Sequence, residues 1–291
     1  MKIGVIGMGF VGGNTAKVLE EAHEILPYDK FKKPYNERQN LDRLTEVSEV
    51  VFLCVPTPMK KSGEIDYSSI RSSLDTLLTS CEDQNRNPLD ILVTIRSTAV
   101  SGTTDSLALD YPFNFAFNPE FLREKHAYED IKNADRIVLG VNDEKSKEKL
   151  LGVYKPVFPD ADYIIVDRKT AEMIKYAANV FLASQIGIAN EIYQICRSIG
   201  VDYDKVKKAI LHDKRIGTNI NVPGHDGDFG FGGKCFPKDL NALIYLAREH
   251  MYRPYLLEEV WRLNEKVRKN ADWFDIAGAV SENMDFKDIS S

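Results

Sequence analysis

The first half of the chain alternates short apolar runs with longer stretches of helical or turn character, and this alternation limits the fold more than any other feature. The apolar or β-branched runs cover residues 3–6, 24–27, 50–55, 91–95, 113–117, 136–141 and 163–166. Each run has the length of a strand, and most of the segments between them are long enough for the crossovers that parallel strands need. The pattern predicts an α/β domain with a doubly wound, mostly parallel sheet over residues 1–167.

The pattern changes after residue 167. Residues 169–199 are apolar nearly all round the helical wheel, which predicts one long helix that is either buried or packed against a partner on several sides. Further helices are expected at 203–212, 237–250 and 254–274, with a glycine-dense loop at 224–233. We therefore expect an all-helical second domain at 168–280 and a polar tail at 281–291.

Composition narrows the class of protein. The 291 residues include 38 Lys and Arg against 44 Asp and Glu, and a net charge of −6 gives no electrostatic basis for binding nucleic acid or an anionic membrane. No stretch approaches the ~20 apolar residues that span a bilayer, and the N-terminus lacks secretory features. The four cysteines show no metal-ligand spacing, and Cys54 and Cys196 lie within apolar runs. We expect a cytoplasmic protein with reduced thiols, no metal, and no nucleic acid or membrane partner.

A glycine motif follows the first expected strand. Gly7-x-Gly9-x-x-Gly12 lies between that strand and an expected helix, and Asp29 ends the second strand. Gly7 permits the tight turn, Gly9 lets the backbone approach a pyrophosphate, and Gly12 lets the helix pack on its strand. A carboxylate at position 29 accepts hydrogen bonds from ribose hydroxyls and repels a 2′-phosphate. The motif therefore predicts a Rossmann-type domain with NAD as cofactor; a glycine turn without a ligand is the alternative.

Two later strand ends are expected to face the same crevice, because ligands bind at the carboxyl ends of parallel strands. Val-Pro-Thr-Pro at 55–58 and Arg-Ser-Thr at 96–98 both follow apolar runs. Thr57 and Thr98 could offer hydroxyls to the nicotinamide half or to a water, and ordinary turn chemistry is the alternative.

The segment 230–239, Gly-Phe-Gly-Gly-Lys-Cys-Phe-Pro-Lys-Asp, is the most informative in the chain. Cys235 follows a glycine-rich loop and precedes a proline by two residues, which places it in the first turn of a helix. A thiol there, beside Lys234 and Lys238, is expected to have a lowered pKa and to act as a nucleophile. Asp239 lies one helical turn further along the same face.

Other polar groups lie in apolar or crevice positions. Lys175 and Asn179 share a face of the long helix, and an ammonium buried there is costly unless it is paired or catalytic. A lysine whose stem alone is buried is the alternative. Glu120 and Glu124 follow the run at 113–117 and could point toward the crevice, although acidic residues also favour the first turn of a helix.

Together these motifs resemble the nucleotide-sugar 6-dehydrogenase family, typified by UDP-glucose dehydrogenase. The resemblance rests on the glycine motif with Asp29 and on the motifs at 55–58, 96–98, 118–124 (Asn-Pro-Glu-Phe-Leu-Arg-Glu), Lys175-x-x-x-Asn179, 215–217 (Arg-Ile-Gly) and 230–239. They occur in the family's order over nearly the whole chain.

The resemblance implies oxidation of a sugar C6 alcohol to a carboxylate with two NAD, with UDP-glucose to UDP-glucuronate as the expected reaction. The aldehyde is held as a thiohemiacetal, oxidised to a thioester and hydrolysed. By the resemblance, Cys235 is the nucleophile, Lys175 and Asn179 stabilise the oxyanion, Asp239 transfers protons through water near Thr98, and Glu120 serves thioester hydrolysis.

The binding residues follow in the same way. The expected partners are a nucleotide-sugar substrate and a second copy of the chain, which forms a homodimer through the helical domain, so that Arg215 reaches the substrate diphosphate of the other subunit. The expected cofactor contacts are Gly7, Met8, Gly9, Phe10, Val11, Gly12, Asp29, Lys33, Pro56, Thr57, Thr98 and Glu124. The expected substrate contacts are Glu120, Phe121, Leu122, Arg215, Phe229, Gly230, Phe231 and Gly232.

Three features depart from the family. Lys234 stands before the nucleophile where the family has a small residue, and the loop 221–229 carries His225, Asp226 and Asp228 where the family places backbone that embraces the substrate. The chain is also expected to lack the family's third domain, which helps to hold the nucleotide.

Two other functions remain open at this point. One is a two-electron hydroxyacid or sugar-phosphate dehydrogenase that uses Lys175 as base and needs no thiol. The other is a non-catalytic NAD-binding subunit.

Overall fold

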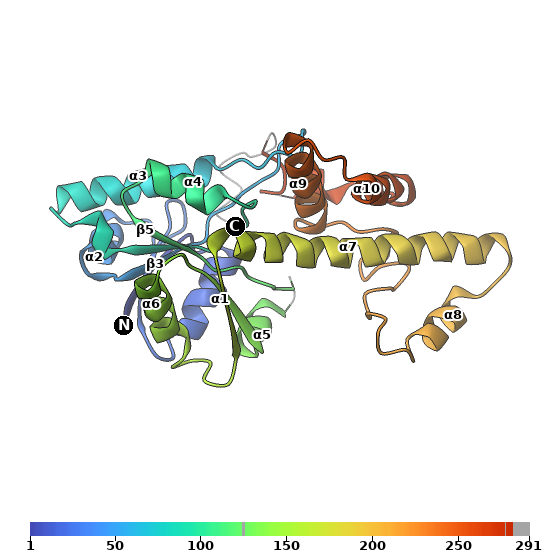
Figure 1. Cartoon of the computed structure of the whole chain (residues 1–291), viewed down its shortest axis with the longest axis horizontal. Coiled ribbons are helices and arrows are strands. Elements are labelled where there is room, and N and C mark those ends of the chain that lie inside the picture. The colour runs from blue at the N-terminus through green and yellow to red at the C-terminus, as the bar shows by residue number, and fades with distance from the viewer. Residues whose placement is uncertain (124–125, 277, 282–291) are drawn as a thin grey trace. The chain divides into compact units, whose positions relative to one another are not determined.

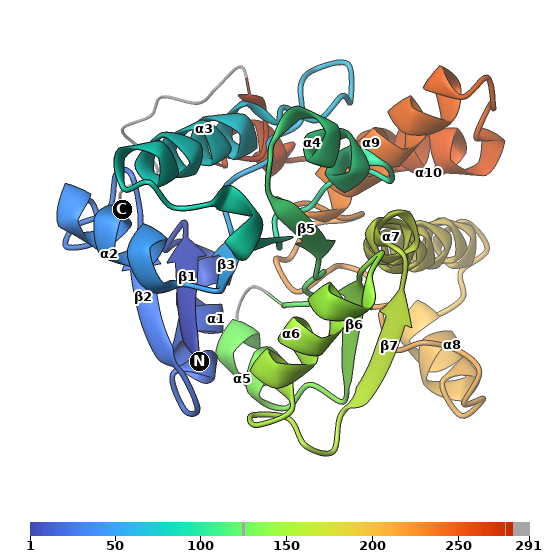
Figure 2. The same cartoon turned by 60° about the vertical axis from the view of Figure 1, so that its left-hand side comes forward.

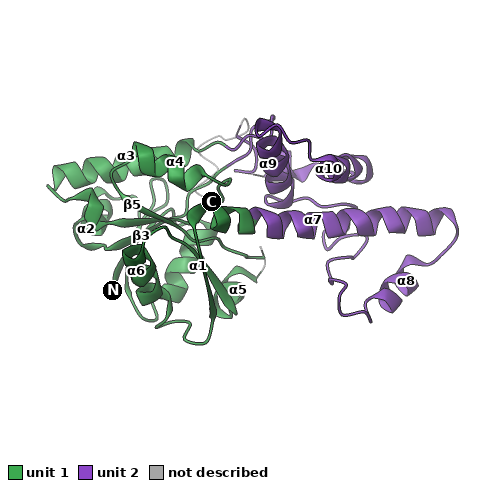
Figure 3. Cartoon of the chain, in the orientation of Figure 1, with its two compact units in different colours: residues 1–57, 66–175, 285–291 green, residues 58–65, 176–284 purple. Residues whose placement is uncertain are grey.

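The chain folds into two compact units in the computed structural model, which describes residues 1–123, 126–276 and 278–281 (Figure 1). Unit 1 contains residues 1–57 and 66–175, and unit 2 contains residues 58–65 and the described residues from 176 onward (Figure 3). The division differs from the expected boundary after residue 167. The first two turns of helix α7 (Arg168–Ser198) belong to unit 1, and the short segment 58–65 belongs to unit 2.

Unit 1 is built on a seven-stranded sheet with the order β2-β1-β3-β4-β5-β6-β7. Neighbouring strands are parallel except β5 and β6, which are antiparallel. The prediction of a doubly wound, mostly parallel sheet is confirmed, and each apolar run forms a strand. The strands are β1 (Lys2–Ile6), β2 (Glu24–Tyr28), β3 (Val50–Leu53), β4 (Leu92–Ile95), β5 (Asn114–Phe117), β6 (Arg136–Gly140) and β7 (Asp162–Val166).

Helices cover both faces of this sheet (Figure 1, Figure 2). Because successive side chains of a strand point to opposite faces, Val50 and Phe52 of β3 enter one core cluster and Val51 and Leu53 enter the other. The first cluster includes residues of α1 (Phe10–Leu19), α5 (Ala127–Lys132) and α6 (Glu144–Tyr154). The second includes residues of α2 (Arg38–Val47), α3 (Ser68–Asp83) and α4 (Thr103–Asp110). Burial on both faces explains the near-continuous apolar runs.

The strand register places the expected cofactor residues at one edge of the sheet. Ile6 of β1 lies beside Leu53 of β3, Leu53 beside Ile95 of β4, and Ile95 beside Phe117 of β5. The chain therefore leaves all four strands at the same edge, where Gly7 and the segments 54–57, 96–98 and 118–122 follow.

Unit 2 is helical, as predicted. It contains most of α7, α8 (Tyr203–Ile210), α9 (Phe236–Glu249) and α10 (Tyr255–Val267). α10 ends earlier than expected, because the backbone of Arg268 turns to an extended conformation, and a separate 3-10 turn follows at Asp272–Phe274. A cluster that includes Phe231, Leu240 and Val260 forms part of its core.

α7 is not buried on every side within the single chain, and its packing against a partner stays a prediction. The Phe181, Ile188 and Ile195 side chains are 74%, 57% and 51% exposed. They repeat at heptad spacing along one side of the helix, so an apolar stripe faces outward. Among the described helices, none combines the length and the hydropathy that a bilayer crossing requires.

Candidate functional site

The glycine loop after β1 has room for a ligand at one position only. Gly7 has a φ of +91°, and a Cβ there would lie 2.5 Å from the carbonyl oxygen of Cys54. A Cβ on Gly12 would lie 1.9 Å from the Gly7 oxygen, whereas a Cβ on Gly9 would meet no atom within 4 Å. Gly9 is the N-cap of α1 and has no side chain to cap it. The open space thus lies over a helix N-terminus, which is where a dinucleotide pyrophosphate binds.

Asp29 is tied to the glycine loop by its carboxylate. One oxygen accepts a hydrogen bond from Met8 N at 2.7 Å, and the other accepts from the amides of Phe31 and Lys32 at 2.9 Å each. A carboxylate has about four acceptor positions, so roughly one remains for a ribose hydroxyl. Lys32 Nζ donates to the Met8 carbonyl at 3.0 Å. Lys32 therefore contacts the loop, and the expected cofactor residue Lys33 is exposed.

The Arg-Ser-Thr segment after β4 combines structural and exposed groups. The buried Arg96 donates to Thr15 Oγ1 at 3.0 Å and to Tyr154 Oη at 3.2 Å, and it also bonds Asn118. The Ser97 hydroxyl accepts from Val55 N at 2.9 Å, which joins the ends of β3 and β4. Arg96 and Ser97 therefore hold the strand ends together. Thr98 is half-buried at the same edge, and Thr57 is buried.

Glu120 and Lys175 form an ion pair within unit 1. Their Oε1 and Nζ atoms are 2.9 Å apart, and the side chains are 9% and 3% exposed. The second Glu120 oxygen accepts from Leu122 N at 2.8 Å, and the Phe121 ring centroid lies 5.6 Å from Lys175 Nζ. Burial acts to raise the pKa of Glu120, but the Lys175 charge and hydrogen bond, the Leu122 amide and the Arg96 charge outweigh it, so this pKa is lowered. The expected cofactor contact Glu124 lies outside the described residues.

Cys235 lies at the N-terminus of α9, as predicted. It is the N-cap residue, its side chain is exposed, and its carbonyl accepts from Asp239 N at 2.8 Å. The buried Asp239 carboxylate accepts from Asn179 Nδ2 at 2.5 Å and is paired with Lys238 Nζ at 2.5 Å. Unit 2 therefore brings together Asp239, Asn179 and Lys238 one helical turn from Cys235.

The expected substrate contacts in unit 2 differ in how they are held. The Phe231 side chain is buried in the core, and the Phe229 ring packs on Tyr193 with the centroids 5.3 Å apart. The Phe231 ring therefore serves packing, so a substrate contact at this position depends on the backbone, whereas the Phe229 ring is only half-buried. Arg215 is exposed and forms an ion pair with Asp213.

One buried carboxylate has no role among the residues that the sequence motifs indicate. Glu172 of α7 accepts hydrogen bonds from Gly102 N at 2.6 Å, Thr104 N at 2.8 Å and the Thr104 hydroxyl at 2.6 Å. It thus caps the N-terminus of α4 from another helix. Burial raises the pKa of Glu172 to about 7, although the Thr104 hydroxyl and the two amides oppose this rise. Its only sequence signal is its place one turn before Lys175.

Both units of the chain match domains of one known protein family. The NAD binding domain of the UDP-glucose/GDP-mannose dehydrogenase family matches residues 30–158, and the central domain of the same family matches residues 169–266. UDP-glucose 6-dehydrogenase of Rickettsia bellii is 34% identical over 100% of this chain and 72% of its own length. UDP-glucose 6-dehydrogenase TuaD of Bacillus subtilis is 33% identical over 92% of this chain and 63% of its own length.

A solved structure of a protein with a related name has a similar fold. The UDP-glucose dehydrogenase of the archaeon Pyrobaculum islandicum has a TM-score of 0.79 and 30% identity, over 91% of this chain and 68% of that chain. The chain spans between 52% and 72% of the length of the first curated relatives it matches. The glycine loop that fits a dinucleotide, the seven-stranded sheet and these matches over both units together show that the chain belongs to the UDP-glucose/GDP-mannose dehydrogenase family and that its N-terminal part is an NAD-binding domain.

Proposed function

We propose that the protein catalyses the four-electron oxidation of a nucleotide-sugar C6 alcohol to the uronate, with UDP-glucose as the first substrate to test. The observation that carries the proposal is an exposed cysteine at the N-terminus of α9 in a chain whose other unit holds a dinucleotide-binding loop. A helix N-terminus stabilises a thiolate, and a thiolate is the form that attacks an aldehyde.

The proposed reaction conserves atoms and charge. One alcohol, two NAD⁺ and one water give one carboxylate, two NADH and three protons. NAD, when bound, accepts the hydride lost from C6 in each of the two oxidations. The Cys235 sulfur forms a bond to the aldehyde carbon between these oxidations, and the resulting thiohemiacetal becomes a thioester when its C–H and O–H hydrogens leave. Water then breaks the C–S bond and restores the thiol.

The remaining polar groups take roles that suit their surroundings. Lys175 and Asn179 lie one turn apart on α7 and present an ammonium and an amide, which are donors suited to an oxyanion. Asp239, held by Asn179 and Lys238, would take and return a proton through a water near Thr98. A lowered pKa keeps Glu120 ionised at neutral pH, as a group that takes a proton from the hydrolytic water must be.

The proposed assembly is a homodimer formed through the apolar stripe of α7, made of Phe181, Ile188 and Ile195. A second copy would bury these side chains and bring Arg215 of one subunit toward the substrate diphosphate of the other. In sedimentation analysis, the wild type should be a dimer and Phe181→Glu with Ile188→Glu a folded monomer. A monomeric wild type at micromolar concentration would contradict the assembly.

The proposed mechanism also needs the Cys235 thiol in its reduced form. We therefore propose a cytoplasmic location, because the cytoplasm keeps thiols reduced.

The experiment that tests the function supplies NAD with UDP-glucose, GDP-mannose and related nucleotide sugars. We expect two NADH for each uronate, and no uronate from Cys235→Ser. Cys196→Ser is the matched control, because Cys196 is buried on α7 and should keep activity. The absence of turnover with every nucleotide sugar, while NAD binding is retained, would reject the function. Uronate at wild-type rates from Cys235→Ser would reject the thioester.

A further inference from the structure

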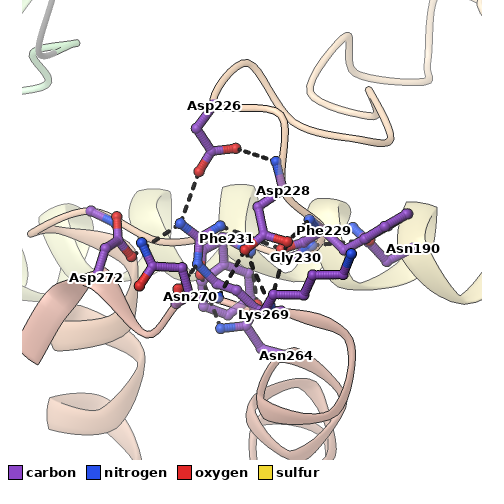
Figure 4. Close-up of polar contacts among 12 residues, drawn as sticks. Asn190, Asp226, Asp228, Phe229, Gly230, Phe231, Asn264, Lys269, Asn270 and Asp272 are labelled. Atoms are coloured by element: carbon purple, nitrogen blue, oxygen red, sulfur yellow. Dashed lines mark hydrogen bonds and ion pairs between the residues drawn. The ribbon is translucent and has the colours of Figure 1, made fainter.

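The loop before Cys235 is anchored by two buried asparagines from helices α7 and α10 (Figure 4). Asn264 of α10 accepts a hydrogen bond from Phe231 N at 2.7 Å and donates one to the Phe231 carbonyl at 3.0 Å. Asn190 of α7 accepts from Gly230 N at 3.0 Å. Each asparagine is 1% exposed. Two consecutive loop amides are therefore satisfied inside the protein by side-chain oxygens.

The segment that follows α10 provides a second set of anchors for the same loop. The Arg268 side chain, 3% exposed, binds Asp226 at 2.8 Å and Asp272 at 3.0 Å. Asp272 in turn accepts from Gly233 N at 3.0 Å. Asp228 accepts from Asn270 N at 2.9 Å, so two loop carboxylates face this segment rather than a ligand (Figure 4).

These anchors explain why the loop is rich in glycine. Gly230 has a φ of +67°, and a Cβ there would lie 2.2 Å from Asn264 Oδ1. A Cβ on Gly232 would lie 2.0 Å from Arg268 Nη2. The two glycines therefore admit the anchoring side chains. The fold itself therefore requires glycine at both positions, whether or not the substrate also contacts them.

We propose that Asn264, with Asn190, is a positioning residue for Cys235. This inference rests on the proposed role of Cys235 as the nucleophile. The Phe231 ring packs in one core cluster with Leu240 and Ile244 of α9. The loop and the helix that Cys235 joins are thus fixed against the same core. Neither asparagine is a catalytic residue; they act on the thiol through the loop backbone.

Loss of the anchor should reduce the rate of the chemical step more than the affinity for NAD. A displacement of about 1 Å at a reacting group can reduce a rate by roughly 100-fold. We expect kcat of Asn264→Ala and Asn190→Ala to fall about 10- to 100-fold, while Kd for NAD stays within about twofold. Asn270→Ala is the matched control, because Asn270 is exposed and only its backbone contacts Asp228.

Asn264→Asp provides a test that does not remove volume. A carboxylate accepts from Phe231 N but repels the Phe231 carbonyl, whereas a protonated carboxyl both accepts and donates, as asparagine does. Burial raises the pKa of such a carboxyl. We therefore expect the ratio of kcat for Asn264→Asp to kcat for the wild type to rise as the pH falls from 9 to 6. A general loss of folding would lower kcat with the folded fraction, which circular dichroism measures.

The outcomes separate this inference from the proposed function. If the wild type oxidises a nucleotide sugar, equal kcat in folded Asn264→Ala, Asn264→Asp and wild type overturns the positioning role. If the wild type oxidises none, the proposed function fails, and alkylation of Cys235 by iodoacetamide is measured instead. An alkylation rate changed more than about threefold in Asn264→Ala but not in Asn270→Ala then supports the anchor. An unchanged rate overturns it.

Discussion

Lys175 Nζ lies 2.9 Å from Glu120 Oε1, and both side chains are almost fully buried. The lysine lies on α7 and the glutamate follows β5, so the pair joins the start of the long helix to the edge of the sheet. A buried ion pair adds little net stability, but the loss of one partner is strongly destabilising because the other charge stays buried. The pair can therefore serve the proposed chemistry only while it is intact.

Glu120→Gln should destabilise unit 1 strongly. We expect the free energy of unfolding at pH 7 to fall by about 3–5 kcal/mol, measured by urea denaturation, because the Lys175 ammonium stays buried without its carboxylate. Glu144→Gln is the control, since its pair with Lys147 is exposed and should contribute at most about 1 kcal/mol. Equal losses in the two variants would contradict the role of burial.

The same pair should make stability depend on pH at the acid end. The folded-state pKa of Glu120 lies below its ordinary value of 4.5, so the unfolded state binds more protons as the pH falls. The stabilisation is present above pH 4.5 and is lost as the pH falls through the folded-state pKa. The difference in unfolding free energy between wild type and Glu120→Gln should therefore shrink between pH 5 and pH 3.

Glu172 should have the opposite pH dependence. Its folded-state pKa of about 7 lies above the ordinary 4.5, so the folded state binds more protons between these values and stability falls as the pH rises. Relative to Glu172→Gln, which does not titrate, the wild type should lose about 3 kcal/mol between pH 4.5 and 7. Thermal or urea unfolding at pH 5 and pH 8 measures this. Glu148→Gln, at an exposed position of α6, is the control and should leave the wild-type pH dependence unchanged.

Gly9→Ala and Gly12→Ala should separate cofactor binding from folding. The Gly9 Cβ would enter open space, so this variant should keep the wild-type Tm but bind NAD at least about tenfold more weakly in calorimetry, because the methyl group occupies the space for the pyrophosphate. The Gly12 Cβ would collide with the Gly7 carbonyl at 1.9 Å, so this variant should lose stability itself. Wild-type NAD affinity in Gly9→Ala would contradict the placement of the pyrophosphate.

Cys235 should be the cysteine that iodoacetamide modifies in the native protein. It is exposed, whereas Cys54, Cys81 and Cys196 are buried. Burial raises the pKa of Cys54 to about 12 and that of Cys81 to about 11, which suppresses their thiolates. Mass spectrometry should show one modified thiol in native protein and four after denaturation. Early modification of a second cysteine in folded protein would contradict the burial that the structure shows.

The strands and the glycine loop could be predicted because their signals are local. A strand buried on both faces is a contiguous apolar run, and the turn before α1 requires glycine at fixed spacing. The place of Cys235 at the start of α9 was predicted for the same reason, from a glycine loop and a proline within a few residues. The roles of Cys235, Lys175, Asn179, Asp239 and Glu120 in a reaction stay proposals.

Other features of the structure could not be predicted from local sequence patterns. The apolar residues of α7 predicted a helix that is buried or packed against a partner, and only the structure shows that Phe181 and Ile188 face outward in the single chain. The carboxylate of Glu172 finds its donors in the loop and first turn of α4, far away in the sequence. The glycines at 230 and 232 were expected to serve the substrate, and their contacts with Asn264 and Arg268 became visible only in the folded chain.

The sequence by itself determined the α/β sheet, the dinucleotide loop and the helical second unit, because neighbouring residues along the chain decide which face is buried and where a turn is allowed. Only the tertiary structure decided which charges and amides meet. Glu120 contacts Lys175, and Phe231 contacts Asn264, because folding brings together residues that are far apart in the sequence. The packing of whole helices and strands determines such pairs, so the local periodicity of the sequence cannot predict them.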